Sequence, residues 1–248
     1  MRPLTAAELL AVWERGQGRS LLERALMLLA AASPGESIDA LAALSIGQRD
    51  GRLLTLREWM FGARLESTAA CSRCSERLEM AFKVADLRAG APPDAPSDAL
   101  ADVSMSAYGY ELEFRLPTSI DLGAISELPG PAIQRRALFE RCLTSIGVGD
   151  QPSTPDQAPA EVIEAVAARM AELDPQADVQ VNLLCPACQH RWQAVFDIAL
   201  FFWNEIEAWA WRILREVHIL ASAYGWSEHD ILALGGMRRQ IYLSMVGA

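Results

Sequence analysis

The sequence predicts a mainly helical α+β protein with a small β unit made of two Cys-x-x-Cys hairpins. Capping boxes and helix-period apolar runs occupy both ends of the chain, whereas alternating apolar and polar residues flank each Cys-x-x-Cys pair. The chain has 248 residues, 51% of them hydrophobic, which is enough for a buried core.

The charge balance narrows the classes of function. The formal net charge is −10 and no long run of Lys or Arg occurs, which disfavours a nucleic-acid partner. Charged residues interrupt both the N-terminal apolar stretch and the long apolar stretch 198–224, so we expect neither a secretory signal nor a membrane helix. We therefore expect a cytoplasmic protein, in which paired cysteines indicate metal or redox chemistry rather than disulfides.

Residues 1–64 are expected to form an N-terminal helical region. Two capping boxes open its first two helices, and Pro34-Gly35 ends the second. A short third helix is expected up to Leu44 and a fourth from about Gln48 to Phe61, with Gly62 as the stop. The two boxes are Thr5-x-x-Glu8 and Ser20-x-x-Glu23.

The middle of the chain divides into three expected segments. Residues 65–89 form the first knuckle hairpin, because apolar residues alternate with polar ones after the cysteines. Residues 90–101 are rich in Pro and Ala and form a linker. Residues 102–174 hold a hairpin that turns at Gly109, then helices over 132–146 and 160–173. Two carboxylates of this segment, Asp121 and Glu127, are expected to face solvent.

Residues 175–197 form the second knuckle hairpin, and residues 198–248 form a C-terminal helical region. A long helix is expected from Asp197 to Tyr224, with one apolar stripe along its length, followed by a last helical segment that Gly235-Gly236 interrupts. Several large apolar residues of the long helix do not belong to the stripe, and we predict them to contact a partner protein. They are Phe201, Trp203, Trp211 and Ile219.

The two knuckles form an internal repeat. Cys185 follows Cys71 by 114 positions, and Cys188 follows Cys74 by the same 114. At that offset Leu78 corresponds to Trp192, and Phe82 to Phe196. Each half is therefore expected to be a strand, a Cys-x-x-Cys turn and a second strand.

The chemistry of the cysteines indicates why the halves should meet. One knuckle supplies two thiolates, whereas a structural zinc ion takes four ligands in a tetrahedron at about 2.3 Å. Two facing hairpins supply all four, as in zinc ribbons. We therefore predict one structural zinc ion held by the four cysteines of the repeat, Cys71, Cys74, Cys185 and Cys188.

Other readings of the cysteines stay open. A redox dithiol normally lies at a strand-to-helix turn, whereas a strand is expected after the second knuckle. An iron–sulfur cluster also takes four thiolates, but the ferredoxin spacing is missing. The site could also have lost its metal, or His190 could replace one cysteine as a ligand. Cys142 is expected to be a small buried hydrophobic residue.

The sequence contains no recognisable set of catalytic residues. A closed four-thiolate site has no open position for substrate, and the sequence lacks nucleophile-elbow, zinc-protease, P-loop and dinucleotide motifs. We expect a protein that is not an enzyme.

Several segments resemble the T4-type bacteriophage baseplate protein family, often described as baseplate hub assembly chaperones, with relatives in phage-tail-like contractile injection systems. The knuckles depart from the usual CxxCG-like turn, because Ser75 and Gln189 replace glycine. A second departure is Gly235-Gly236, where the family leads us to expect a helix. The resemblance rests on the two knuckles and on the segments Ile46–Asp50, Leu53–Glu58, Phe61-Gly62, Leu78–Met80, Asp86-Leu87, Phe114–Thr118, Cys185–Ile198, Tyr224–Trp226, Ile231–Leu234, Arg238-Arg239 and Tyr242-Leu243.

The resemblance implies a baseplate component or hub assembly chaperone that binds other baseplate or hub proteins; as a component it would be incorporated in the particle. Two alternatives belong to other classes. A zinc-ribbon nucleic-acid adaptor would need a basic face near the knuckles, and a thiol oxidoreductase would act through the cysteines. The candidates for the basic face are Arg64, Arg73, Arg77 and Arg191.

Overall fold

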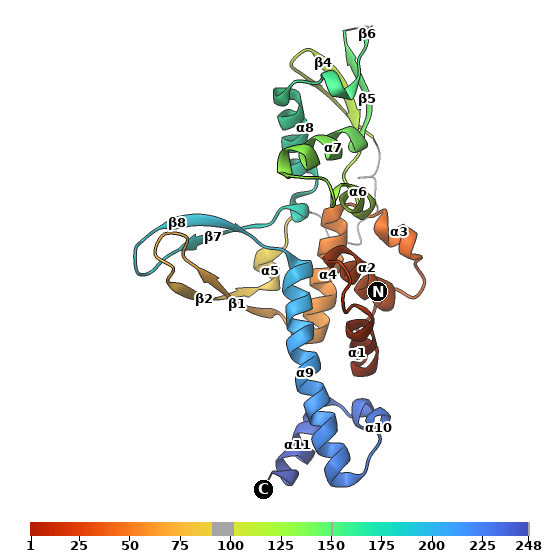
Figure 1. Ribbon diagram of the computed structural model, residues 1–248, viewed down its shortest axis with the longest axis vertical. Coiled ribbons are helices and arrows are strands. Elements are labelled where there is room, and N and C mark those ends of the chain that lie inside the picture. The colour runs from red at the N-terminus through yellow and green to blue at the C-terminus, as the bar shows by residue number, and fades with distance from the viewer. Residues whose placement is uncertain (91–101, 150, 248) are drawn as a thin grey trace. The chain divides into compact units, whose positions relative to one another are not determined.

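The computed structural model describes residues 1–90, 102–149 and 151–247 and divides the chain into two compact units (Figure 1). One unit joins Met1–Ser37 to Asp197–Ala248, and the other spans Ile38–Phe196. The six expected segments do not coincide with these units, since the helices of residues 1–64 fall partly in each. Residues 91–101, which include nearly all of the expected linker, lie outside the described residues.

The first unit is helical. Both predicted capping boxes are present, with Thr5 at the start of α1 and Ser20 at the start of α2. The 27-residue α9 contacts α1, α2, α10 and α11. Most of its predicted apolar stripe is buried, although Tyr224 at its end is 38% exposed. The helices of this unit are α1 (Ala6–Arg15), α2 (Leu21–Ala32), α9 (Ile198–Tyr224), α10 (Glu228–Ala233) and α11 (Gly236–Val246).

The second unit contains a helix-and-sheet module and two separate hairpins. Its helices are α3 (Ile38–Ala42), α4 (Ile46–Phe61), α5 (Val84–Leu87), α6 (Ser119–Ile125), α7 (Pro131–Cys142) and α8 (Ala160–Leu173), with 3₁₀ turns η2 (Pro155–Gln157) and η3 (Pro175–Ala177). Its strands are β1 (Arg64–Ala70), β2 (Arg77–Lys83), β3 (Val103–Ala107), β4 (Tyr110–Phe114), β5 (Leu143–Val148), β6 (Gln151–Pro152), β7 (Gln180–Leu184) and β8 (Arg191–Val195).

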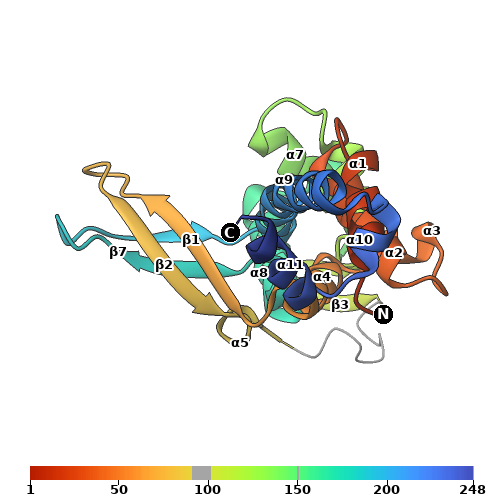
Figure 2. The ribbon, with the colours of Figure 1, turned by 90° about the horizontal axis from the view of Figure 1, so that it is seen from below.

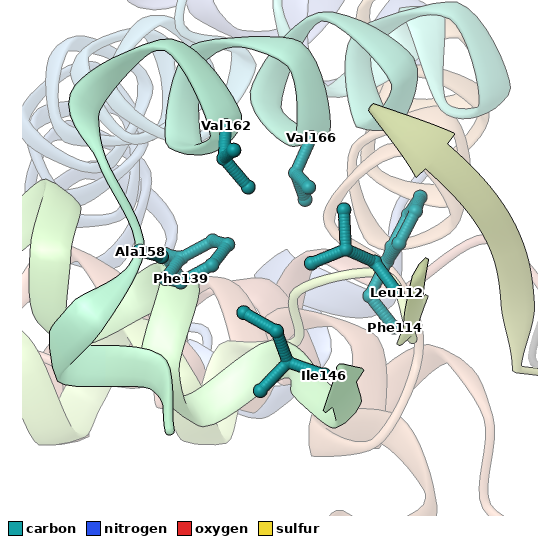
Figure 3. Close-up of a cluster of buried hydrophobic side chains, with 7 residues drawn as sticks. All are labelled: Leu112, Phe114, Phe139, Ile146, Ala158, Val162 and Val166. Atoms are coloured by element: carbon teal, nitrogen blue, oxygen red, sulfur yellow. The ribbon is translucent and has the colours of Figure 1, made fainter. Parts of the chain in front are cut away.

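The module between the hairpins is an antiparallel sheet in the order β3-β4-β5-β6, covered on one face by α7 and α8. Figure 3 shows Val162 and Val166 of α8 directed toward Leu112 of β4 and Ile146 of β5. The β3–β4 turn has positive φ at Tyr108 as well as at the predicted Gly109. The other face of the sheet is polar, as is usual for an antiparallel sheet with one solvated face.

The expected helix over residues 132–146 is wrong in its last part. α7 ends at Cys142, and Leu143 begins strand β5, which pairs with β4. The helical signal of 132–142 continues into Leu143 and Ile146, so apolar spacing alone does not separate the two elements. The segment becomes a strand because pairing with β4 places Ile146 opposite Leu112 in the core.

Hydrogen bonds join the module to the chain before and after it. Asp174 accepts a hydrogen bond from the Gly47 backbone N–H at 2.8 Å, at the N-terminus of α4. The Gln176 amide accepts from Ala89 N–H at 2.8 Å and donates to the Leu87 carbonyl at 3.2 Å. Gln176 therefore ties the chain leaving the first hairpin to the chain approaching the second.

Candidate metal centre

The internal repeat seen in the sequence persists in the backbone. Hairpin β1–β2 places Ala69 opposite Leu78, and hairpin β7–β8 places Leu183 opposite Trp192, which are the same positions shifted by 114. Figures 1 and 2 show the two hairpins side by side. Each is followed by a helix that starts at an equivalent residue, Val84 or Ile198.

The two Cys-x-x-Cys turns have the same hydrogen-bond pattern. The Ser75 N–H donates to the Cys71 carbonyl, and the Gln189 N–H donates to the Cys185 carbonyl, both at 2.9 Å. Ser75 and Gln189, the residues that replace the usual glycine, have φ values of 62° and 58°. Each turn therefore keeps a residue in the left-handed backbone conformation, which is sterically less favourable for Ser or Gln than for Gly.

The four sulfurs meet between the hairpin tips. Cys71 Sγ lies 3.7 Å from Cys188 Sγ, and Cys74 Sγ lies 3.6 Å from Cys185 Sγ. All four Sγ atoms are within 4.8 Å of one another. The two cross-hairpin distances are far longer than the roughly 2.05 Å of a disulfide, but they match the edge of about 3.8 Å in a tetrahedron of sulfurs about 2.3 Å from zinc.

The electrostatics of the cluster fit a cation. Burial raises the pKa of the Cys71 thiol, but backbone N–H groups of Arg73 and Cys74 outweigh it and bring that pKa to about 7. At Cys74 a backbone N–H, from Glu76, lowers the thiol pKa, yet the neighbouring sulfurs and burial raise it to about 12. The Cys71 thiol thus ionises readily, whereas the Cys74 thiol resists ionisation because a second thiolate would lie close to the first. A divalent cation removes this repulsion.

Apolar and aromatic side chains surround the sulfurs. Leu78 is buried with Cys71 and Cys185, and Met80 and Trp192 pack against them. His190 does not take the place of a cysteine in the cluster: its ring stacks on Trp192 with centroids 5.6 Å apart, and its Nε2 lies 3.1 Å from Ser72 Oγ. His190 therefore joins the two knuckle turns. Cys142 is fully buried in α7, away from this cluster, as the sequence predicts.

The donor set suits a structural metal better than the alternatives. A redox dithiol of the thioredoxin type lies before a helix, whereas both knuckles here lie between paired strands. Four thiolates at tetrahedral spacing satisfy all the positions of a zinc ion. These four residues could hold such a metal.

The four residues predicted to contact a partner differ in their exposure to solvent. Trp211 is 64% exposed, although its ring makes an edge contact with Trp13 at 6.0 Å. Phe201 and Ile219 are half-buried. Trp203 is only 1% exposed, with the Arg24 guanidinium 4.5 Å from its ring centroid. Trp203 therefore belongs to the core of its unit and is withdrawn from the predicted partner surface.

The prediction that Asp121 faces solvent is wrong, because its side chain is fully buried. Arg115 donates two hydrogen bonds to its carboxylate, at 2.6 and 2.8 Å, and Arg141 donates one at 3.1 Å. Burial alone raises the pKa of Asp121, but Arg115 and Thr118 outweigh it and hold that pKa well below its usual range. Thr118-x-x-Asp121 is a capping-box pattern at the start of α6, and that signal was available in the sequence.

The structure locates three of the four arginines that a nucleic-acid adaptor would need. Arg64 forms an ion pair with Glu66 at 3.0 Å. Arg77 and Arg191 occupy equivalent positions on different hairpins, opposite Ala70 and Leu184.

One of three comparisons with known proteins gives a match. In the part of the chain that the structure describes, no helix combines the length and hydropathy needed to cross a membrane. No curated protein and no solved structure matches the chain significantly. The family model described as T4 bacteriophage base plate protein matches residues 8–203, a stretch that includes both knuckles and the module between them. The chain belongs to the T4 bacteriophage base plate protein family.

Proposed function

We propose that this protein is a non-catalytic assembly protein of the baseplate of a contractile phage tail or phage-tail-like injection system, stabilised by one structural zinc ion. Family membership supports the baseplate role. The zinc ion is supported above all by one observation, the four cysteine sulfurs gathered from two halves of the chain.

The absence of an enzymatic role is proposed from the chemistry of the site. Four thiolates fill the coordination sphere of zinc, so no position is left for water or substrate. Such an ion acts on folding, because the ligands come together only in the folded protein. The centre would thus hold the tips of two hairpins together and present them as one element.

Binding to other baseplate or hub proteins is the activity that remains. The partly exposed aromatic and aliphatic residues of α9, Phe201, Trp211 and Ile219, are candidate contacts. Both a permanent component and a chaperone released during assembly would act through such contacts. We favour neither form over the other.

Quantitative capture tests this proposal. Tagged protein purified from cells that produce the particle should bring down named baseplate or hub proteins of that particle in constant ratio. Assembled particles, purified separately, then distinguish the two forms: a component is present in them, and a chaperone is bound only to unassembled proteins. If the tagged protein associates with no baseplate protein in either fraction, the proposal is wrong.

A further inference from the structure

One face of α11 is apolar and open to solvent. Met237, Ile241 and Met245 recur every fourth residue and therefore lie along one side of the helix. They are 83%, 49% and 60% exposed. We call these three residues the α11 stripe.

The opposite side of α11 is firmly anchored to α9. Arg239 Nε donates to Glu216 Oε2 at 3.1 Å, and each of these side chains is only 10% exposed. Gln240 donates to the other oxygen of the same carboxylate at 2.8 Å. Tyr242 and Leu243 pack against the buried cluster formed by Val217, Leu220 and Ile231.

The buried ion pair fixes the orientation of α11 about its own axis. Rolling the helix to cover the stripe would separate Arg239 from Glu216 and leave a buried charge without its partner, which is strongly unfavourable. The exposure of the stripe is therefore built into the fold. Isolated exposed apolar residues are common, but these three lie in one row on one helix face, and contiguous exposed apolar residues often mark functional surfaces.

We propose that α11 inserts its stripe into an apolar groove, rimmed by carboxylates, on another baseplate protein. This inference rests on the proposed function and adds the contact surface and the chemistry of the partner. Apolar anchors one turn apart on one helix face are the pattern by which helices bind grooves. The family match ends at residue 203, so α11 lies beyond the part of the chain that the match accounts for.

Two observations favour a groove on a different protein over a second copy of this chain. The three stripe residues of each copy are far fewer than the roughly 20–30 residues that a stable interface uses on each side. Arg238 is exposed on α11, Arg239 is already paired with Glu216, and the helix has no acidic residue, so an acidic rim complements Arg238.

Site-specific photo-crosslinking in the full-length protein tests the proposal. A photoreactive residue at Ile241, in cells that produce the particle, should label one apolar segment with flanking Asp or Glu on a baseplate protein. The same residue at Ser222, exposed on α9, is the matched control and should not label that segment. Labelling of a second copy, or of residues 38–196 of the same chain, would overturn the proposal.

Substitutions separate this inference from the proposed function. The triple variant Met237→Gln, Ile241→Gln, Met245→Gln should keep its helical content and lose at least tenfold in association with the labelled protein. Arg238→Glu, which leaves the apolar row intact, should weaken the same association and reverse its salt dependence. If both variants associate like the wild type, α11 is not the contact, while the baseplate role stands. If the wild type associates with no baseplate protein, both proposals fail.

Discussion

Removal of one metal ligand, by Cys185→Ser, should weaken zinc binding strongly. Zinc bound to four-ligand peptides is worth roughly 10–16 kcal/mol near neutral pH, or about 2.5–4 kcal/mol for each of the four ligands. Since about 1.4 kcal/mol is a factor of ten, the variant should bind zinc roughly fifty- to a thousandfold more weakly in competition with a chelator. The wild type should contain one zinc per chain by elemental analysis of dialysed protein.

The structural effect of zinc loss should be local. Each hairpin is a two-stranded sheet, which is rarely stable alone in water, and the apolar cluster at the tips is small. The module around Phe114 and Val162 has a core of its own. After chelation, trypsin should therefore cut at Arg77 and Arg191 in the hairpins, while the module and the helical unit resist.

Cys142→Ala is the matched control, because it removes a cysteine that the site does not use. It should leave zinc content at one per chain and cost about 1–2 kcal/mol of stability, through a small cavity in the core. The reasoning is refuted if Cys185→Ser binds zinc as tightly as the wild type does. Wild-type protein without metal whose hairpins still resist trypsin refutes it equally.

Three further predictions concern single residues of the Ile38–Phe196 unit. Asp121→Asn should cost about 2–3 kcal/mol in urea denaturation, less than a fully buried pair because Arg115 and Arg141 are about a third exposed. The folded pKa of Asp121 lies below its unfolded value, so its contribution to the free energy of unfolding is complete above about pH 4 and is lost as the pH falls. The variant's stability should therefore fall less steeply with acid than that of the wild type. Equal falls in stability would contradict this. Gly47→Ala should destabilise the unit by about 2 kcal/mol in thermal unfolding, because the new Cβ would lie 1.9 Å from Asp174 Oδ1. The control Gly35→Ala should have little effect, because a Cβ there would meet no atom within 4 Å. Gln189→Gly should stabilise the metal-bound form by about 0.5–1 kcal/mol, since φ is 58° there, and an unchanged or lower midpoint in guanidinium would argue against a strained turn.

The cluster of four cysteines was predictable because its signal is a repeated pair of chemically specific residues. Four cysteines in two identical spacings, with matching apolar residues at one offset, identify a repeat without knowledge of the fold. Capping boxes likewise identified the starts of α1 and α2. These signals act over a few residues, so the rest of the chain does not alter them.

Features that depend on distant neighbours were not predictable in this way. Whether Leu143–Val148 is helix or strand is decided by β4, which pairs with it. Asp121 looks like a surface carboxylate until Arg115 and Arg141 are placed around it. Trp203 appeared to lie on the outer side of α9, but Arg24 of α2 covers its ring. In each case a contact that forms only in the folded chain determines the outcome, although the Thr118-x-x-Asp121 capping pattern was a local sign that Asp121 is not a free surface carboxylate.

The contacts at the hairpin bases limit what a bound metal would contribute to the fold. The sulfur pairs bring together residues 117 and 111 positions apart, and closing a loop of that length in an unfolded chain costs about 4–5 kcal/mol. Gln176 joins the bases of the two hairpins through Leu87 and Ala89, so part of this closure is made by protein groups alone. We therefore expect a bound ion to stabilise the two hairpins through their tips rather than to set the chain topology. Its loss should melt the hairpins and spare the module between them, which has its own core.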